Sequence, residues 1–228
     1  MEIEKNFDFE YWISTIEYHL LSREMTEKET IAGCKQAVSY HVPVVCVKPC
    51  YVHQSVAVLR GTDTKAATVI GYPFGDLPTS IKAKETKLAL TEGVLELNMV
   101  ANTSLLIDGN DGSFKKDIES ICCLARMNGA LLNVIINSGF LSNELLRKAA
   151  EYSEKIGAAW LSPSTGIDET NEDEFLPIIK EAIDGKINVK TMTSVESFDT
   201  WLRNYELGFR RFATKDLGIL IKSFEKDQ

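Results

Sequence analysis

Polar side chains with catalytic potential recur directly after short apolar runs of this chain. Lys48 follows the run VVCV, Lys190 ends the run INVK, and Thr214 and Lys215 follow RRFA. An unprotonated lysine amine can attack a carbonyl carbon, and lysines with small hydroxyl residues can bind a carbonyl or phosphate oxygen. The pattern therefore indicates a pocket that binds a carbonyl or phosphate group, provided that the ends of these runs meet in space.

The apolar runs alternate with helical patterns along the chain. The predicted strands, of which the first is the weakest, cover residues 13–20, 44–47, 67–70, 94–99, 131–136, 158–161, 187–190 and 209–213. The predicted helices between them cover residues 28–40, 81–92, 114–128, 144–156, 172–184 and 196–205. Alternation of this kind predicts a parallel sheet. Eight strands, with no G-x-G-x-x-G after any of them, favour a closed (β/α)8 TIM barrel over an open doubly wound sheet.

Neither a linker nor a low-complexity segment divides the chain, so residues 1–228 are predicted to form a single TIM-barrel domain. In such a barrel the chemistry lies at the carboxyl ends of the strands. Besides the four residues above, this rule places a further group of polar or small residues at the rim. They are Gly71, Asn98, Asn137, Ser138, Ser162, Ser164, Thr165 and Gly166.

Composition excludes several classes of function. The formal net charge of −8 argues against nucleic acid as a partner, because phosphate backbones require clustered lysine and arginine. No window reaches the roughly 18 consecutive apolar residues of a membrane span. Five cysteines, an odd number with no C-x-x-C pair, predict reduced thiols and a cytoplasmic location. The three histidines lack metal-ligand spacing, so neither a metal nor another cofactor is expected.

Seven segments, in this order, resemble the deoxyribose-phosphate aldolase family. They are IEYHLL (residues 16–21), VVCVKP (44–49), TVIGYPFG (68–75), KAKET (82–86), GVLELNMV (93–100), LNVIIN (132–137) and LSPSTG (161–166). The first is similar to the family's I-D-H-T-L-L segment, and the resemblance fades after about residue 191. It implies a TIM barrel and a class I aldolase, often dimeric, so a homodimer is a further expectation.

In that family a lysine on the sixth strand attacks the substrate carbonyl and forms a Schiff base. A second lysine on the seventh strand keeps the first unprotonated by like-charge repulsion. An aspartate on the fourth strand relays the proton. A Gly-Gly turn after the seventh strand and a Ser-rich turn after the eighth bind the substrate phosphate. The resemblance implies these roles for the matching positions of this chain.

The chain departs from that plan at the catalytic positions. Ser162 stands where the Schiff-base lysine is expected, and a hydroxyl cannot form an imine. Asn98 replaces the aspartate and cannot relay a proton near neutral pH. The seventh-strand lysine is retained as Lys190. The chain is therefore interpreted as a divergent member that lacks the Schiff-base lysine.

The phosphate-binding turns are altered as well. Thr193 and Ser194 replace the Gly-Gly pair, and Lys215 with Asp216 replaces the serines. Side chains at the first turn limit the close approach of a phosphate to the backbone. The carboxylate at the second turn, together with the acidic composition, weakens the case for a phosphorylated substrate, and few positive groups are expected at the barrel mouth.

The candidate catalytic residues are accordingly Lys190, Asn98, Ser162 and Lys48. Lys48 shares a strand face with Cys46, so Lys48 and Lys190 could recreate the two-lysine arrangement in a new place, although a solvated loop lysine is the simpler interpretation of Lys48. Glu96 either supplies an acid–base group or pairs with Lys190 inside the barrel. The candidate substrate-binding residues are Cys46, Glu96, Thr165, Gly166, Thr193, Ser194, Thr214 and Lys215.

Three functional hypotheses remain open. The first is an aldolase-like protein that acts on or binds a small carbonyl or sugar-phosphate-like metabolite without the sixth-strand lysine. The second is a catalytically silent homologue that serves as a metabolite- or protein-binding module. The third is an active deoxyribose-phosphate aldolase that uses a relocated lysine.

Overall fold

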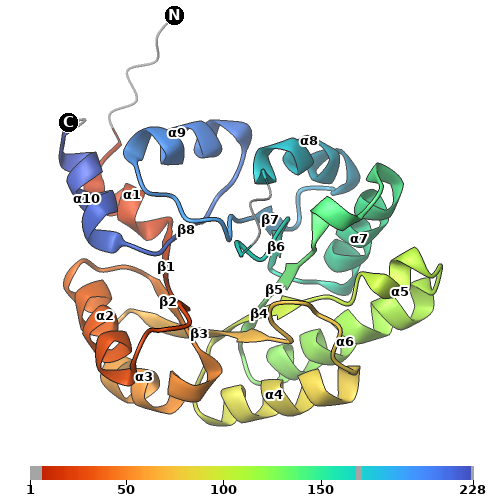
Figure 1. Cartoon of the computed structure of the whole chain (residues 1–228), viewed down its shortest axis with the longest axis horizontal. Coiled ribbons are helices and arrows are strands. Elements are labelled where there is room, and N and C mark those ends of the chain that lie inside the picture. Colours follow the sequence, from red (N-terminus) through yellow and green to blue (C-terminus); the bar gives the residue numbers. More distant parts are fainter. Residues whose placement is uncertain (1–6, 168–170, 227–228) are drawn as a thin grey trace, which may run out of the picture.

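Eight parallel strands, all within residues 7–167 and 171–226 that the computed structural model describes, form the inner wall of the molecule, with helices outside them (Figure 1). From β1 to β7 each strand pairs with the next strand in sequence, and β1 also pairs with β8. An isolated parallel bridge between Lys190 and Arg211 joins the ends of β7 and β8. The predicted (β/α)8 barrel is confirmed. The strands are β1 (Ile16–Leu20), β2 (Val44–Val47), β3 (Lys65–Ile70), β4 (Glu96–Val100), β5 (Leu131–Ile135), β6 (Trp160–Ser162), β7 (Asn188–Val189) and β8 (Phe212–Thr214).

The helices follow the strands in the expected alternation. Those that the sequence predicts are α2 (Glu27–Ser39), α4 (Thr79–Thr91), α6 (Asp111–Met127), α7 (Asn143–Ile156), α8 (Glu172–Ala182) and α9 (Phe198–Leu207). The sequence pattern does not predict α1 (Phe9–Ser14), α3 (Val52–Leu59), α5 (Ser104–Ile107), α10 (Leu217–Lys226) or the short 3-10 turns Pro49–Tyr51 and Ser138–Phe140. Among the described residues, no helix combines the length and the apolar character needed to cross a bilayer.

The first predicted strand begins too early. Asp8 caps the amino end of α1 by accepting a hydrogen bond from the Glu10 amide, which starts a helical turn that includes Ile13 and Ser14. The strand proper starts at Ile16. The difference places Glu17 and His19, which alternate with apolar residues, on one face of β1.

The two faces of the strand wall are packed differently. The outward face meets the helices in the main apolar core, which contains Leu20, Val45, Leu97 and Val134. On the inward face a smaller apolar cluster consists of Val44, Cys46, Ala67 and Val69. A second inward apolar cluster consists of Val100, Ile135 and Met192. Polar side chains that are fully or almost fully buried, among them Glu17, Asn98, Asn133 and Lys190, occupy other inward positions. A buried polar interior needs internal hydrogen bonds, and this requirement shapes the site described below.

A buried ion pair fixes the carboxyl end of β4 to two helices. Lys82 Nζ on α4 lies 2.7 Å from Asp117 Oδ2 on α6 and donates a second hydrogen bond of 2.9 Å to the carbonyl of Val100. Asp117 also accepts hydrogen bonds from Thr79 Oγ1 and the amide of Asn102. Burial lowers the pKa of Lys82, and the Asp117 carboxylate opposes that effect. The pair therefore holds the loop after β4 in place.

A buried carboxylate joins the loops that follow β6 and β7. Glu172, at the start of α8, accepts hydrogen bonds from Ser164 Oγ (2.6 Å), the Met192 amide (3.1 Å) and the Thr193 amide (3.4 Å). Burial raises the pKa of Glu172 to about 7, although these three donors act to lower it. The loops after β6 and β7 are thus held together by one titratable side chain.

Replacement of Lys82 by methionine tests the structural role of the buried Lys82–Asp117 ion pair. Lys82→Met leaves Asp117 buried without its cation, so we expect a loss of about 3–5 kcal/mol in the free energy of unfolding, measured by urea denaturation followed by circular dichroism. The matched control is Lys155→Met, because Lys155 pairs with Glu151 at 69% side-chain exposure. We expect at most about 1 kcal/mol from the control. Equal losses for the two variants would contradict the structural role of the buried pair.

The buried Glu172 carboxyl predicts a dependence of the free energy of unfolding on pH. Since the pKa of Glu172 is about 7 in the folded chain and 4.5 ordinarily, the folded state holds a proton that the unfolded state releases between these values. The free energy of unfolding should therefore fall as pH rises from 4.5 to 7, by on the order of 3 kcal/mol from this group.

Glu172→Gln should lack this component of the pH dependence, as measured by urea denaturation across that range. The control is Glu174→Gln, because Glu174 lies two residues further along α8 and its side chain is exposed. An unchanged pH dependence in Glu172→Gln would refute the assignment.

Candidate active site

A buried ion pair lies in the barrel interior. Lys190 Nζ, at the end of β7, is 2.5 Å from Glu17 Oε2 on β1, and the two side chains are 0% and 1% exposed. Glu17 Oε1 accepts a hydrogen bond of 2.9 Å from Asn98 Nδ2 on β4. Burial alone would raise the pKa of Glu17, but Lys190, together with His19 and Arg211, holds it well below its ordinary value. Glu17 is therefore a carboxylate at neutral pH.

Amide and hydroxyl groups continue this network across the barrel. Asn133 Nδ2 donates to Asn98 Oδ1 at 2.9 Å, and Ser162 Oγ donates to Asn133 Oδ1 at 3.2 Å. Asn98 Nδ2 is also 3.2 Å from Cys46 Sγ. The structure thus joins the predicted residues Asn98, Ser162 and Lys190 in one buried network, with Glu17 as the link that the sequence did not single out.

Cys46 and Glu96 belong to the interior of the barrel. Burial, followed by the Glu17 charge, raises the pKa of the Cys46 thiol, so it is not a thiolate nucleophile. Glu96 Oε2 lies 2.5 Å from Arg211 Nη1. The predicted pairing of Glu96 with Lys190 is wrong, because Arg211 takes Glu96 and Glu17 takes Lys190.

Lys48 binds the loop after β1. Its Nζ donates hydrogen bonds to the carbonyls of Ser22 (3.1 Å), Arg23 (3.3 Å) and Met25 (2.5 Å), and it lies 5.1 Å from the centroid of the Tyr51 ring. Carbonyl oxygens stabilise the charged ammonium. The structure therefore gives Lys48 and Lys190 separate partners and offers no support for the hypothesis that they act as a pair.

A cavity of about 530 Å³ opens at the carboxyl ends of the strands. Its lining includes His19, Lys48, Thr165, Gly166, Met192 and Lys215. Asn98, Ser162 and Lys190 are not among the lining residues. Met192 explains this separation, since it packs against Val100 and Ile135 and its Sδ is 3.9 Å from Asn133 Nδ2. Met192 therefore lies between the cavity and the buried network.

The remaining predicted binding residues divide into two groups. Thr165, Gly166 and Lys215 line the cavity, and Gly166 adopts a φ of +69° where a Cβ atom would lie 2.1 Å from the Met192 carbonyl oxygen. This close approach requires glycine. Thr193, Ser194 and Thr214 do not line the cavity. They support the rim instead, as Ser194 Oγ does by accepting a hydrogen bond from the Lys215 amide at 2.9 Å.

The cavity mouth is positively charged. Arg23, Lys48 and Lys215 line it, whereas Glu85 is the acidic residue of the described lining and accepts a hydrogen bond of 2.8 Å from the Gly71 amide. The expectation that few positive groups reach the mouth is therefore wrong. The cause is local. The arginine and one lysine lie on loops after β1 and β2 that the resemblance does not associate with phosphate binding.

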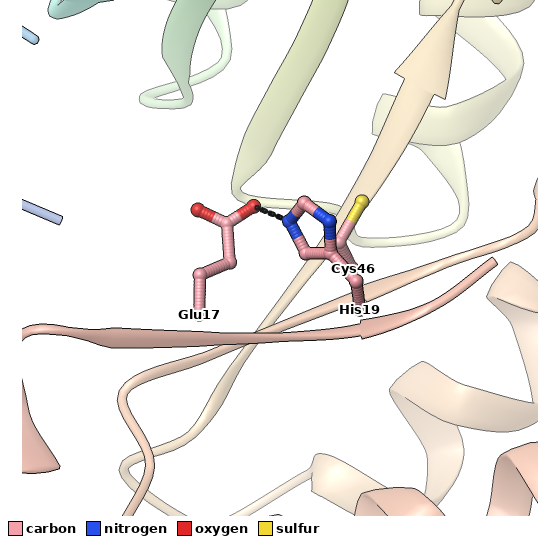
Figure 2. A group of neighbouring side chains, drawn as sticks. All are labelled: Glu17, His19 and Cys46. Atoms are coloured by element: carbon pink, nitrogen blue, oxygen red, sulfur yellow. Dashed lines mark hydrogen bonds and ion pairs between the residues drawn. The ribbon is translucent and has the colours of Figure 1, made fainter. Parts of the chain in front are cut away.

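Glu17, His19 and Cys46 form a buried cluster with their ligand-type atoms within 4.8 Å of one another (Figure 2). Such a set could in principle hold a metal ion. However, Lys190 contacts the Glu17 carboxylate, Arg211 lies 3.8 Å from it, and the thiol keeps its proton. Two cations at the carboxylate disfavour a third. The cluster is better described as a hydrogen-bonded pair, His19 and Glu17, beside an unreactive thiol.

Sequence reasoning missed the two residues of β1 in this cluster. His19 is 3% exposed, and its Nε2 is 3.1 Å from Glu17 Oε1. The available signal was the alternation of polar and apolar residues in IEYHL, which places Glu17 and His19 on the face opposite Ile16, Tyr18 and Leu20.

No family model matches the chain. Curated relatives do: a deoxyribose-phosphate aldolase of Clostridium tetani is 34% identical over 197 residues, 86% of this chain and 91% of the relative. One from Staphylococcus epidermidis strain RP62A is 31% identical over 215 residues, covering 93% and 96%.

Solved structures agree with this relationship. The aldolase QR15 has a TM-score of 0.84 at 27% identity, over 93% of this chain and 95% of the other. A tetrameric deoxyribose phosphate aldolase from Aeropyrum pernix, at 22% identity over 97% and 94%, shares the fold with a TM-score of 0.87. With these relatives, the chain belongs to the deoxyribose-phosphate aldolase family.

Proposed function

We propose that this chain binds a small, anionic carbonyl or sugar-like metabolite in the barrel mouth and does not form a Schiff base at the sixth-strand position. The relatives' name suggests a phosphorylated deoxy sugar as the model ligand. The cavity of about 530 Å³ suits a molecule of that size, and its three cationic side chains suit an anion.

The position of Ser162 carries the proposal. Its side chain is fully buried, its hydroxyl donates to Asn133 Oδ1, and it does not line the cavity. A hydroxyl cannot form an imine, and this one is not accessible to a ligand. Ser162 is therefore a structural member of the interior network.

Lys190 does not take over the missing role in this geometry. Its side chain is fully buried, its Nζ contacts the Glu17 carboxylate, and it does not line the cavity. A nucleophilic amine must reach the substrate carbonyl, and this amine lies 2.5 Å from the Glu17 carboxylate and does not line the cavity. This arrangement argues against the alternative of an active aldolase that uses Lys190, and it leaves the silent binding module as the second candidate.

Reductive trapping tests the absence of an imine. The chain is incubated with deoxyribose 5-phosphate or acetaldehyde, treated with borohydride, and digested for peptide mass mapping. We expect no reduced adduct on Lys190, because its side chain is fully buried and does not line the cavity. A reduced adduct on Lys190, lost in Lys190→Met, would contradict the proposal. Exposed Lys35 serves as the internal control for nonspecific modification.

Binding of an anionic sugar should depend on the cations of the mouth. We expect Lys215→Met and Arg23→Met each to weaken the binding of deoxyribose 5-phosphate about fivefold, as measured by isothermal titration calorimetry. A partly exposed charge contact contributes about 1 kcal/mol. Unphosphorylated deoxyribose should bind more weakly and respond less to these changes.

The control for this series is Lys35→Met, since Lys35 is exposed on α2 and does not line the cavity. Its affinity should match that of the unaltered chain. If all three variants bind deoxyribose 5-phosphate equally well, the cationic mouth is not the binding site.

A further inference from the structure

His19 is the one member of the Glu17–His19–Cys46 cluster that reaches the cavity. His19 lines the cavity, whereas Glu17 and Cys46 are buried and are not among the lining residues. One ring nitrogen, Nε2, is 3.1 Å from Glu17 Oε1, and the other, Nδ1, is on the side of the ring turned away from Glu17 (Figure 2). Among the described residues, Nδ1 has no hydrogen-bond partner.

The charge of Glu17 determines which nitrogen carries the proton. Because Lys190 and its other neighbours keep the pKa of Glu17 well below the ordinary value, its oxygens can only accept hydrogen bonds. Nε2 must therefore be the donor. In a neutral imidazole the other nitrogen is then unprotonated, so Nδ1 presents a lone pair that can accept a proton.

We propose that His19 is an acid–base catalytic residue, which removes a proton from the carbon next to the carbonyl group of the bound ligand. The reaction is a proton transfer on a free carbonyl compound and needs no lysine adduct. This inference rests on the proposed function, because it assumes that a carbonyl or sugar-like metabolite occupies the cavity.

The step is balanced without any further reactant. Nδ1 of His19 takes the proton, the electrons of the broken C–H bond form a C=C bond, and the carbonyl oxygen takes the displaced electron pair as an enolate. Glu17 stabilises the imidazolium through Nε2–H, as an acidic partner does for a catalytic histidine. Return of a proton from His19 to carbon restores the carbonyl compound, with solvent hydrogen incorporated.

The charges around His19 favour both halves of this step. On β1 and β7 it faces Glu17 and, through it, Lys190. On β2 it faces the protonated thiol of Cys46. The cavity brings Lys48 and Lys215, together with Arg23 and Glu85, to the ligand side. The carboxylate stabilises the imidazolium, and the cations of the mouth can stabilise the enolate oxygen.

Exchange of hydrogen for deuterium tests the proposal. The full chain is incubated in D2O with deoxyribose 5-phosphate, whose open-chain aldehyde has two hydrogens at C2, and the C2 proton signals are followed by NMR. We expect loss of these signals without cleavage of the sugar and without adduct in the borohydride experiment.

His19→Gln retains a polar side chain of similar length but has no basic nitrogen. It should lower the rate of exchange by at least about 100-fold with little change in the Kd for the sugar phosphate. Exposed His53 provides the matched control, and His53→Gln should exchange at the original rate. His19→Thr, which is β-branched and suited to a strand, is the second variant if His19→Gln does not fold by circular dichroism.

The outcomes separate the two proposals. Binding of the sugar phosphate by the unaltered chain without exchange at C2 would overturn the role of His19 and leave the proposed function standing. Exchange that persists in the folded His19 variants would overturn it as well. Failure of the unaltered chain to bind the sugar phosphate by calorimetry would overturn the proposed function, and this inference with it.

Discussion

The buried ion pair between Glu17 and Lys190 is the constraint on which the rest of the barrel interior depends. Two charges that are almost completely removed from water are stable only if every remaining lone pair and proton has a partner. Asn98 and His19 complete the shell around Glu17, and the chain of hydrogen bonds from Asn98 ends at Ser162. Asn98 and Ser162, the two catalytic positions at which the resemblance implies a departure, are thus parts of one connected network.

Charge balance links the two replacements that the resemblance implies. The interior holds the carboxylates of Glu17 and Glu96 and the cations of Lys190 and Arg211, which cancel. According to the resemblance, Asn98 replaces an aspartate and Ser162 replaces a lysine. Each change alone would leave an unpaired charge in the barrel, whereas both together remove one charge of each sign. The pair of neutral residues can then hydrogen-bond through Asn133.

The sequence predicts the fold well because alternation of strands and helices is a property of long periodic segments. It fails for α3 because that helix, VHQSVAVL, is rich in β-branched valine, and for α1 because a short capped turn precedes the first strand. For the site, the rule that chemistry lies at strand ends correctly places Thr165, Gly166 and Lys215 at the cavity. The rule carries no information on burial, so it cannot show that Lys190 is fully buried and does not line the cavity.

The mouth of the barrel shows why net charge is a poor guide to a local site. The chain carries a formal charge of −8, yet three cations face the cavity and its carboxylate, Glu85, is bound to a backbone amide. At physiological ionic strength, exposed charges are screened over about 8 Å, so acidic residues on the outer helices act weakly at the mouth. Side chains within a concave, partly dry cavity act on a ligand at much shorter range. The acidity of the whole chain therefore argues against a large polyanion as a partner but not against a single phosphate.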